Sequence, residues 1–182
     1  QIASSRNKTC CIIVWSAAVI VLVGAASPVL VAPPKASEAL ALMPIQPHIE
    51  FARPAKDEVD RCTVRADKFG GGTAWFVRDP QGQLIRRFAD SNGDNVVDQW
   101  SYFRDGLEVY RDIDSDFNGH ADQYRWFNSA GTRWGEDDDQ DGKIDRWRQI
   151  SAQEVAEELV TALKHRDSAR FALLLPDQKE LQ

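Results

Sequence analysis

Three acidic segments of nine residues carry the side chains best suited to chemistry in this chain. They read DSNGDNVVD from Asp90, DSDFNGHAD from Asp114 and DDDQDGKID from Asp137. Their first residues lie 24 and 23 positions apart (114 − 90 and 137 − 114), so the segments form an internal repeat. Asp or Asn occupies positions one, three and five of every segment, and Asp occupies position nine. A tightly curved loop with several oxygen ligands is what a hard divalent cation such as calcium binds.

Four side chains of each segment are therefore candidate metal ligands. They are Asp90, Asn92, Asp94 and Asp98; Asp114, Asp116, Asn118 and Asp122; and Asp137, Asp139, Asp141 and Asp145. Position six is Asn95, Gly119 or Gly142, the residue types that most readily adopt a left-handed backbone. We expect up to three calcium ions. The alternative is a set of solvated turns, in which Asp and Asn side chains accept hydrogen bonds from their own backbone.

The segments differ from EF-hand loops, which need a bidentate Glu at position twelve and a helix on each side. Position twelve is Ser101, Arg125 or Arg148. Each segment leads instead into five residues rich in aromatic side chains, which favours a strand. These strands are expected at residues 99–103, 123–127 and 146–150.

The pattern D-x-[DN]-x-[DN]-[GN]-x-x-D before a strand resembles the calcium loops of integrin-type FG-GAP repeats. The resemblance covers only the nine-residue loops, and it implies that the backbone carbonyl at position seven is a further ligand. In this chain those carbonyls belong to Val96, His120 and Lys143. The whole unit also resembles uncharacterised bacterial secreted proteins with tandem hairpins of acidic loops and Trp-bearing strands, a resemblance that implies no activity.

Hairpins must hold these loops in place. Residues 72–89 read as a strand, a turn at 79–82 and a second strand, and further turns are expected at 104–106 and 128–131. The short turns alternate with the acidic loops. The sequence therefore predicts a mainly β fold, an antiparallel meander of roughly seven strands with the calcium loops along one edge.

Aromatic residues recur in the predicted strands. Alternation places Trp100 with Tyr102, and Tyr124 with Trp126, on one shared face, as a hydrophobic core requires. Arg125 falls on the opposite face, together with Arg148. The alternative is that the aromatic stripe binds sugar rings or peptides by stacking.

Composition divides the chain into four parts. Residues 1–32 resemble a secretory signal or a membrane anchor, because Arg6 and Lys8 precede an apolar run from Cys10 to Ala26. Residues 33–66 are rich in proline and are expected to be a linker. Residues 67–150 form the repeat domain. In residues 151–182, Ser151 and Glu154 form a capping box before a helical segment.

The apolar stripe of that helical segment is expected to be Val155, Leu159, Val160 and Leu163, and Asp167 is expected to cap a second helix. These helices either cover one face of the sheet or begin a further domain. Cys62 would be the only cysteine left after cleavage of the N-terminal segment, and we expect it to be a small buried side chain.

The net charge is −6, but residues 90–145 contain 13 Asp and 2 Glu against 4 Arg and 1 Lys, which gives −10. Such an acidic block argues against nucleic acid as a partner. No nucleophile elbow or phosphate loop is present in the sequence, so we expect no enzymatic activity.

The predicted function is that of an exported calcium-binding structural or interaction module. A cell-surface protein or a glycan is the expected partner, and contact with a membrane is expected only through an uncleaved N-terminal segment. One alternative is a non-catalytic region of a secreted or cell-surface enzyme, and another is a carbohydrate-binding module.

Overall fold

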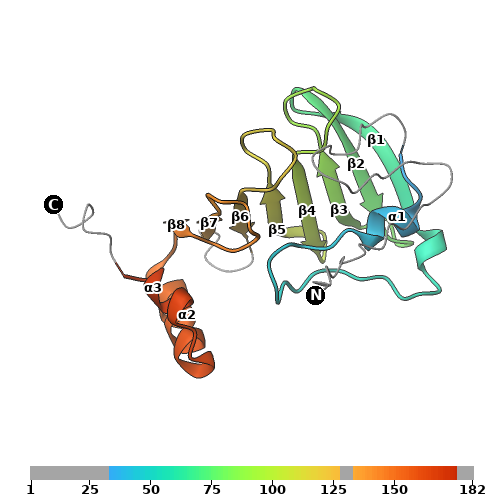
Figure 1. Cartoon of the computed structure of the whole chain (residues 1–182). Helices are drawn as coiled ribbons and strands as arrows, with labels where there is room; N and C mark the ends of the chain where they lie inside the picture. Colours follow the sequence, from blue (N-terminus) through green and yellow to red (C-terminus); the bar gives the residue numbers. More distant parts are fainter. Residues whose placement is uncertain (1–32, 128–132, 176–182) are drawn as a thin grey trace, which may run out of the picture.

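Eight antiparallel strands form one sheet in the computed structural model, which describes residues 33–127 and 133–175. Each strand pairs with the next one in the chain (Figure 1). The strands are β1 Thr63–Phe69, β2 Gly72–Arg78, β3 Leu84–Ala89, β4 Gln99–Arg104, β5 Leu107–Ile113, β6 Gln123–Trp126, β7 Trp134–Glu136 and β8 Arg146–Gln149. The predicted meander is confirmed. It has one strand more than expected, because β1 precedes the first predicted hairpin.

Short turns and acidic loops alternate between the two ends of the sheet (Figure 1). In the turn between β2 and β3, Asp79 Oδ1 accepts hydrogen bonds from the N–H groups of Gln81 and Gln83. Asp105 and Gly106 both have positive φ between β4 and β5, the geometry of a two-residue hairpin turn. The predicted turn at 128–131 lies outside the described residues. The acidic loops join β3 to β4, β5 to β6 and β7 to β8, so all three lie at one end.

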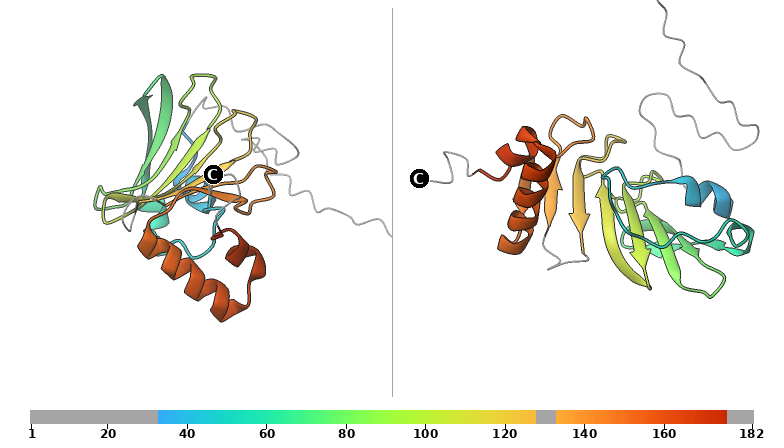
Figure 2. Two further views of the ribbon diagram at one scale, coloured as in Figure 1. Left: turned by 90° about the vertical axis from the view of Figure 1, so that its left-hand side faces the viewer. Right: turned by 90° about the horizontal axis from the view of Figure 1, so that it is seen from below.

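The proline-rich segment differs from the expected linker, because it crosses one face of the sheet as an ordered arm (Figure 2). The arm contains α1, Ala36–Ala41, and a short 3₁₀ helix, Val59–Arg61. Three residues of this segment, Ala39, Phe51 and Cys62, are buried. The Ala52 N–H donates to the Phe103 carbonyl over 2.8 Å, and buried Arg86 donates to the Ala52 carbonyl over 2.8 Å. Prolines at positions 33, 34, 44, 47 and 54 interrupt the apolar side chains of the arm, so no long periodic pattern runs through this segment.

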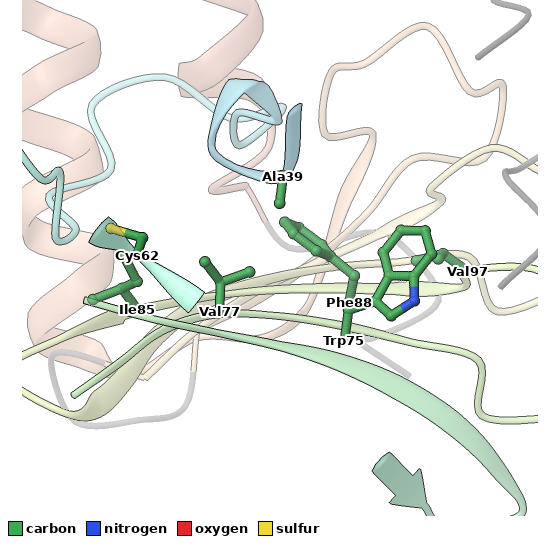
Figure 3. Close-up of a cluster of buried hydrophobic side chains, with 7 residues drawn as sticks. All are labelled: Ala39, Cys62, Trp75, Val77, Ile85, Phe88 and Val97. Atoms are coloured by element: carbon green, nitrogen blue, oxygen red, sulfur yellow. The ribbon is translucent and has the colours of Figure 1, made fainter. Parts of the chain in front are cut away.

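Two hydrophobic clusters lie between the arm and the sheet. Figure 3 shows the first, in which Trp75, Val77, Ile85 and Phe88 of β2 and β3 lie beneath α1. The second contains Phe51 of the arm with three tyrosines, and Trp100 and Trp126 pack against it. The tyrosines are Tyr102, Tyr110 and Tyr124. The prediction that Trp100, Tyr102, Tyr124 and Trp126 share a core face is therefore confirmed.

Two helices follow β8. In α2, Ala152–His165, the predicted capping box is present: the Glu154 N–H donates to Ser151 Oγ, and the Ser151 N–H donates to Glu154 Oε2. Asp167 caps α3, Ser168–Ala172, by accepting from the Arg170 N–H. None of the helices in the described part of the chain combines the length and apolar character needed to cross a membrane. The predicted signal or anchor at 1–32 lies outside that part.

The predicted apolar stripe of α2 is only partly covered, because Val155 and Leu159 are half-buried but the other two residues are not. Val160 and Leu163 are each 64% exposed, whereas Glu154, Glu158 and Ala162 are buried. The reason is an arginine beside β7: Arg133 pairs with Glu158, and its guanidinium lies over the rings of Trp126 and Trp147 at 4.9 and 5.0 Å. Ion pairing therefore decides which side of the helix faces the sheet.

Candidate metal centres

The three acidic loops share one backbone conformation. Positions four and six have positive φ in every loop: Gly93 and Asn95, Phe117 and Gly119, and Gln140 and Gly142. The left-handed position six was predicted from its residue types. Position four was not, because Phe117 and Gln140 are side chains that rarely adopt this conformation, and each carries a cost of about 1 kcal/mol or more. Three loops that differ in sequence thus adopt the same curve.

Each loop closes around the aspartate at position one. Asp90, Asp114 and Asp137 are each 1% exposed. Their carboxylates accept backbone N–H groups from across the loop, for example from Gly119 over 2.7 Å in loop two and from Gly142 over 2.9 Å in loop three. These hydrogen bonds to the buried carboxylate hold the loop in its tight curve and leave the candidate ligands at positions three, five and nine around it.

The side chains at positions three and five accept hydrogen bonds from the backbone two residues further on. The position-three side chain accepts the N–H of position five, and position five accepts the N–H of position seven. The carbonyl ligands predicted at Val96, His120 and Lys143 stay a prediction. In loop three the Lys143 ammonium pairs with Asp141, and this hydrogen bond holds the pKa of the Asp141 carboxyl below its usual value.

Carboxylates from positions one, three and nine come together in two loops. Oxygen atoms of Asp114, Asp116 and Asp122 lie within 4.8 Å of one another, and the same holds for Asp137, Asp139 and Asp145. Within the described ranges, no such carboxylate group is found in loop one. Its position three is Asn92, whose amide oxygen accepts the Asp94 N–H. Loops two and three therefore carry the better candidate metal centres.

One carboxylate oxygen in loop two is shielded from solvent and has no hydrogen-bond donor. Asp122 Oδ2 accepts N–H groups from Ser115 and Asp116 at 3.0 and 3.3 Å. Asp122 Oδ1 is shielded from solvent and accepts no hydrogen bond, and it is the only carboxylate oxygen of this kind in residues 33–127 and 133–175. An anionic oxygen without a partner in a shielded position is costly, and a cation between the three carboxylates would satisfy it.

Burial also disfavours the charged form of several loop residues. It raises the pKa of Asp114, where the carboxyl of Asp116 acts in the same direction, and it raises the pKa of Asp98 against the hydrogen bonds from Ser91. Both effects mean that a carboxylate is held where a positive charge would stabilise it.

A polar layer behind the loops was missed by the sequence reasoning. The Tyr124 hydroxyl donates to Asp137 Oδ2 over 2.7 Å. The Tyr110 hydroxyl donates to Asp112 Oδ1 over 2.5 Å, and the Ile45 N–H donates to Asp112 Oδ2 over 3.3 Å. Burial raises the pKa of Asp112 to about 7. The available signal was Asp112 itself, which falls between the strand-forming residues 107–111 and the second acidic loop, because a charged side chain on the core face needs partners.

The loops are joined to one another and to the arm. The N–H of Asp114 donates to the Asp98 carbonyl over 2.8 Å, and the N–H of Asp137 donates to the Asp122 carbonyl over 2.9 Å. Position one of a loop is thus bonded to position nine of the loop before it. From the arm, Gln46 Nε2 donates to the Gly142 carbonyl of loop three over 3.0 Å.

Comparisons with known proteins find no matching family model, no similar curated protein and no similar solved structure. The resemblance of the loops to FG-GAP loops therefore stays a prediction. The arrangement can supply oxygen ligands to a divalent cation at one end of the sheet. Zinc is a poor fit, because no Cys lies in the loops and His120 is their only imidazole.

Proposed function

We propose that this chain is a non-catalytic, exported module whose sheet is stabilised by calcium in its acidic loops and which acts in structure or interaction. The observation that carries the proposal is Asp122, which has a shielded oxygen, Oδ1, without a hydrogen-bond donor and whose carboxylate groups with those of Asp114 and Asp116. The equivalent cluster in loop three and the common backbone curve support it further.

The physical role of the ion follows from where the ligands lie. Carboxylates within a few ångströms repel one another in the folded loop, and a divalent cation reverses the sign of that interaction. Only the folded loop presents all of its ligands together, so calcium binds the native state preferentially. For weak extracellular sites with millimolar calcium, linkage gives about 1 kcal/mol of stability per site.

Two measurements on the full chain test the calcium proposal. Native mass spectrometry at millimolar calcium should count two or three bound ions, with loops two and three filled first. A thermal melt in excess chelator should show a lower melting temperature than a melt in calcium, and magnesium should restore little of the difference, because a flexible carboxylate loop does not impose its tight octahedron. No bound ion, or superimposable melts, would show that the acidic loops are only solvated turns.

Export is supported by Arg6, Lys8 and the apolar run from Cys10 to Ala26. A chain expressed with this segment should leave the cytoplasm, and N-terminal sequencing of the exported form should distinguish cleavage near Ala26 from anchoring. Recovery of the uncleaved chain from the cytosol would contradict this part of the proposal.

A further inference from the structure

The first strand of the sheet has one edge without a partner strand. β1 pairs only with β2 and lies at one end of the sheet (Figure 1). It is seven residues long and pairs with β2 without a register shift, whereas register shifts interrupt the pairing of β2 with β3, β4 with β5 and β7 with β8. Its central residues, Arg65, Ala66, Asp67 and Lys68, are all exposed. A long, regular edge strand presents free N–H and C=O groups to which another strand can bind.

The backbone direction of each β1 residue follows from its partner in β2. Lys68 stands opposite Thr73, and the Thr73 carbonyl accepts the N–H of position one of loop one over 2.8 Å, on the far side of β2. Thr73 therefore faces away from β1, and Lys68, its partner without a ladder hydrogen bond, faces the free edge. Because this direction alternates along a strand, the N–H and C=O groups of Ala66 and Val64 also point outward. Among the described residues, the sole acceptor for these three N–H groups is the Asp67 carboxylate, 2.8 Å from the Lys68 nitrogen.

The residues of β1 are complementary to a second, antiparallel copy of the same strand. With Ala66 opposite Ala66 of the second copy, the outward-facing Val64 meets Lys68, and these residues form the hydrogen-bonded pairs of a ladder. Between these pairs Arg65 stands opposite Asp67, on the face of the sheet away from the arm. Neither charge has an ion pair among the described residues of its own chain. The second copy therefore supplies the opposite charge that each of them lacks.

Charge also selects this register over its neighbours. Outward-facing residues must meet outward-facing residues, so the smallest allowed slip is two positions. One such slip places Arg65 opposite Arg65, and the other places Asp67 opposite Asp67. Like charges directly opposite each other destabilise an antiparallel pair. Charged residues on an edge strand ordinarily prevent association, whereas these leave one register in which all of β1, Thr63–Phe69, is paired and the charges directly opposite each other have opposite signs.

We propose that the chain forms a two-fold symmetric homodimer in which the β1 edges of two copies pair and join their sheets. Arg65 and Asp67 then form two symmetric ion pairs on one face, and on the other face the alkyl stem of Lys68 covers Val64, which packs against the first hydrophobic cluster. Growth ends at the dimer because the other edge strand, β8, has four residues, two of them arginines, and a register shift against β7. One strand edge is smaller than a standard interface of about 1,600 Å², so the dimer should dissociate on dilution. Calcium is not required, because no residue of β1 belongs to an acidic loop.

Sedimentation equilibrium of the full chain over a range of concentrations tests the dimer, and the native chain should show a monomer–dimer equilibrium. R65D and D67R each place like charges opposite each other twice in the interface, so each should raise the dissociation constant of the dimer about tenfold. The double variant R65D/D67R exchanges the two charges and should return this constant to within about threefold of the native value. K164D reverses an exposed charge on α2 and should change it less than about twofold. Equal weakening by R65D and K164D would overturn the proposal.

The variant A66C tests the register and the identity of the occupant. Hydrogen-bonded partners in an antiparallel pair have Cα atoms about 5.5 Å apart, a spacing that a disulfide spans. Mild oxidation should therefore join two copies of A66C through position 66, as mass spectrometry of the linked peptides would show. In the control K68C the two copies of position 68 stand about 14 Å apart and should not be joined. A monomer at all concentrations, a double variant as weak as the single ones, or equal cross-linking of A66C and K68C would overturn the proposal. A disulfide from position 66 to Cys10 or Cys11 of the same chain would also overturn it, because the N-terminal segment would then cover the edge.

Discussion

Asp122 differs from the two other aspartates at position nine by having an oxygen that is shielded from solvent and has no hydrogen-bond donor. Asp98 accepts the Ser91 N–H on both oxygens, and Asp145 accepts the N–H groups of Asp138 and Asp139 on Oδ2. The shielded Asp122 Oδ1 accepts nothing in the described structure. A substitution that keeps one oxygen acceptor at position 122 but removes the negative charge therefore tests whether the charge of Asp122 binds a cation.

For Asp122→Asn we expect opposite results in the two conditions. In chelator the melting temperature should hold or rise, because the amide oxygen still accepts from Ser115 and repulsion with Asp114 and Asp116 is relieved. In calcium the variant should lose about 1 kcal/mol of stability relative to the native chain, the contribution of one weak site. Asp105→Asn, at the other end of the sheet, is the control and should show no calcium-dependent change. An equal loss in both conditions would mean that Asp122 is only a structural acceptor.

Gly72 is required by loop one. A Cβ at this position would lie 2.4 Å from the Asp90 carbonyl oxygen and 2.9 Å from its carboxylate, whereas a Cβ at Gly71 would lie 3.4 Å from the Ser91 carbonyl oxygen. Gly72→Ala should lower the free energy of unfolding by about 1–3 kcal/mol because the loop must move, and Gly71→Ala should change it by less than about 0.5 kcal/mol. Urea unfolding of both variants checks this, and equal effects would contradict the close approach.

At the scale of elements, the sequence predicted the hairpins well. The turns at 79–82 and 104–106 and the strands after each acidic loop follow local rules, because turn residues and alternation act over a few positions. The candidate ligands in each loop were inferred from the same repeat, and their role as ligands stays a prediction. The arm could not be predicted, since its role depends on a sheet that forms from residues later in the chain. Likewise, only the partner Arg133 shows which side of α2 is buried.

The arm supplies a large part of the core, which a linker would not. Phe51 is 8% exposed, its ring lies 5.3 Å from that of Tyr102, and the Arg86 guanidinium lies over it at 4.2 Å. Phe51→Ala should cost about 3–5 kcal/mol by leaving a cavity and an uncovered arginine. Met43→Ala, in the same arm but 49% exposed, should cost less than about 0.5 kcal/mol. Calorimetry of both variants is the check, and a neutral Phe51→Ala would show that the arm does not stabilise the sheet.

Glu108 of β5 is tied to β3 across β4 by its ion pair with Arg87, and it also pairs with Arg111 of its own strand. Burial acts to raise its pKa, but the hydrogen bonds and positive charges of Arg111 and Arg87 outweigh burial, so the net pKa is lowered. A group with a depressed folded pKa contributes stability that is present above its unfolded pKa and is lost as pH falls through the folded value.

The native chain should therefore be more stable than Glu108→Gln by a constant amount near neutral pH. This difference in stability should shrink below about pH 4.5, the pKa of the glutamate in the unfolded chain. Melts of both proteins across this range measure the difference directly. Glu50→Gln, whose partner Arg104 is on the surface, should show almost no such difference because the pair is 78% and 54% exposed. A native advantage that grows on acidification would contradict the assigned charge state.

At the scale of the whole molecule, the half of the sheet that contains β1 to β4 and the half that contains β6 to β8 are stabilised in different ways. Strands β1 to β4 are six or seven residues long, and most of the first hydrophobic cluster lies on them. Strands β6, β7 and β8 have four, three and four residues, and neither cluster contains a residue of β7 or β8. We therefore expect the stability of β6 to β8 to depend more on loops two and three, where the carboxylates group together.

Hydrogen exchange of the full chain should show this division. Removing calcium should raise exchange in β6 to β8 about thirtyfold, the effect of losing two weak sites of about 1 kcal/mol each, and should leave β2 to β4 nearly unchanged. Asp145→Asn in calcium should raise exchange in β7 and β8, because it weakens loop three alone. Replacing calcium by magnesium should raise exchange in β6 to β8 in the same way as removing calcium. A uniform rise across all eight strands would mean that the sheet opens as one unit, and no rise in β6 to β8 would mean that calcium does not hold this end of the sheet.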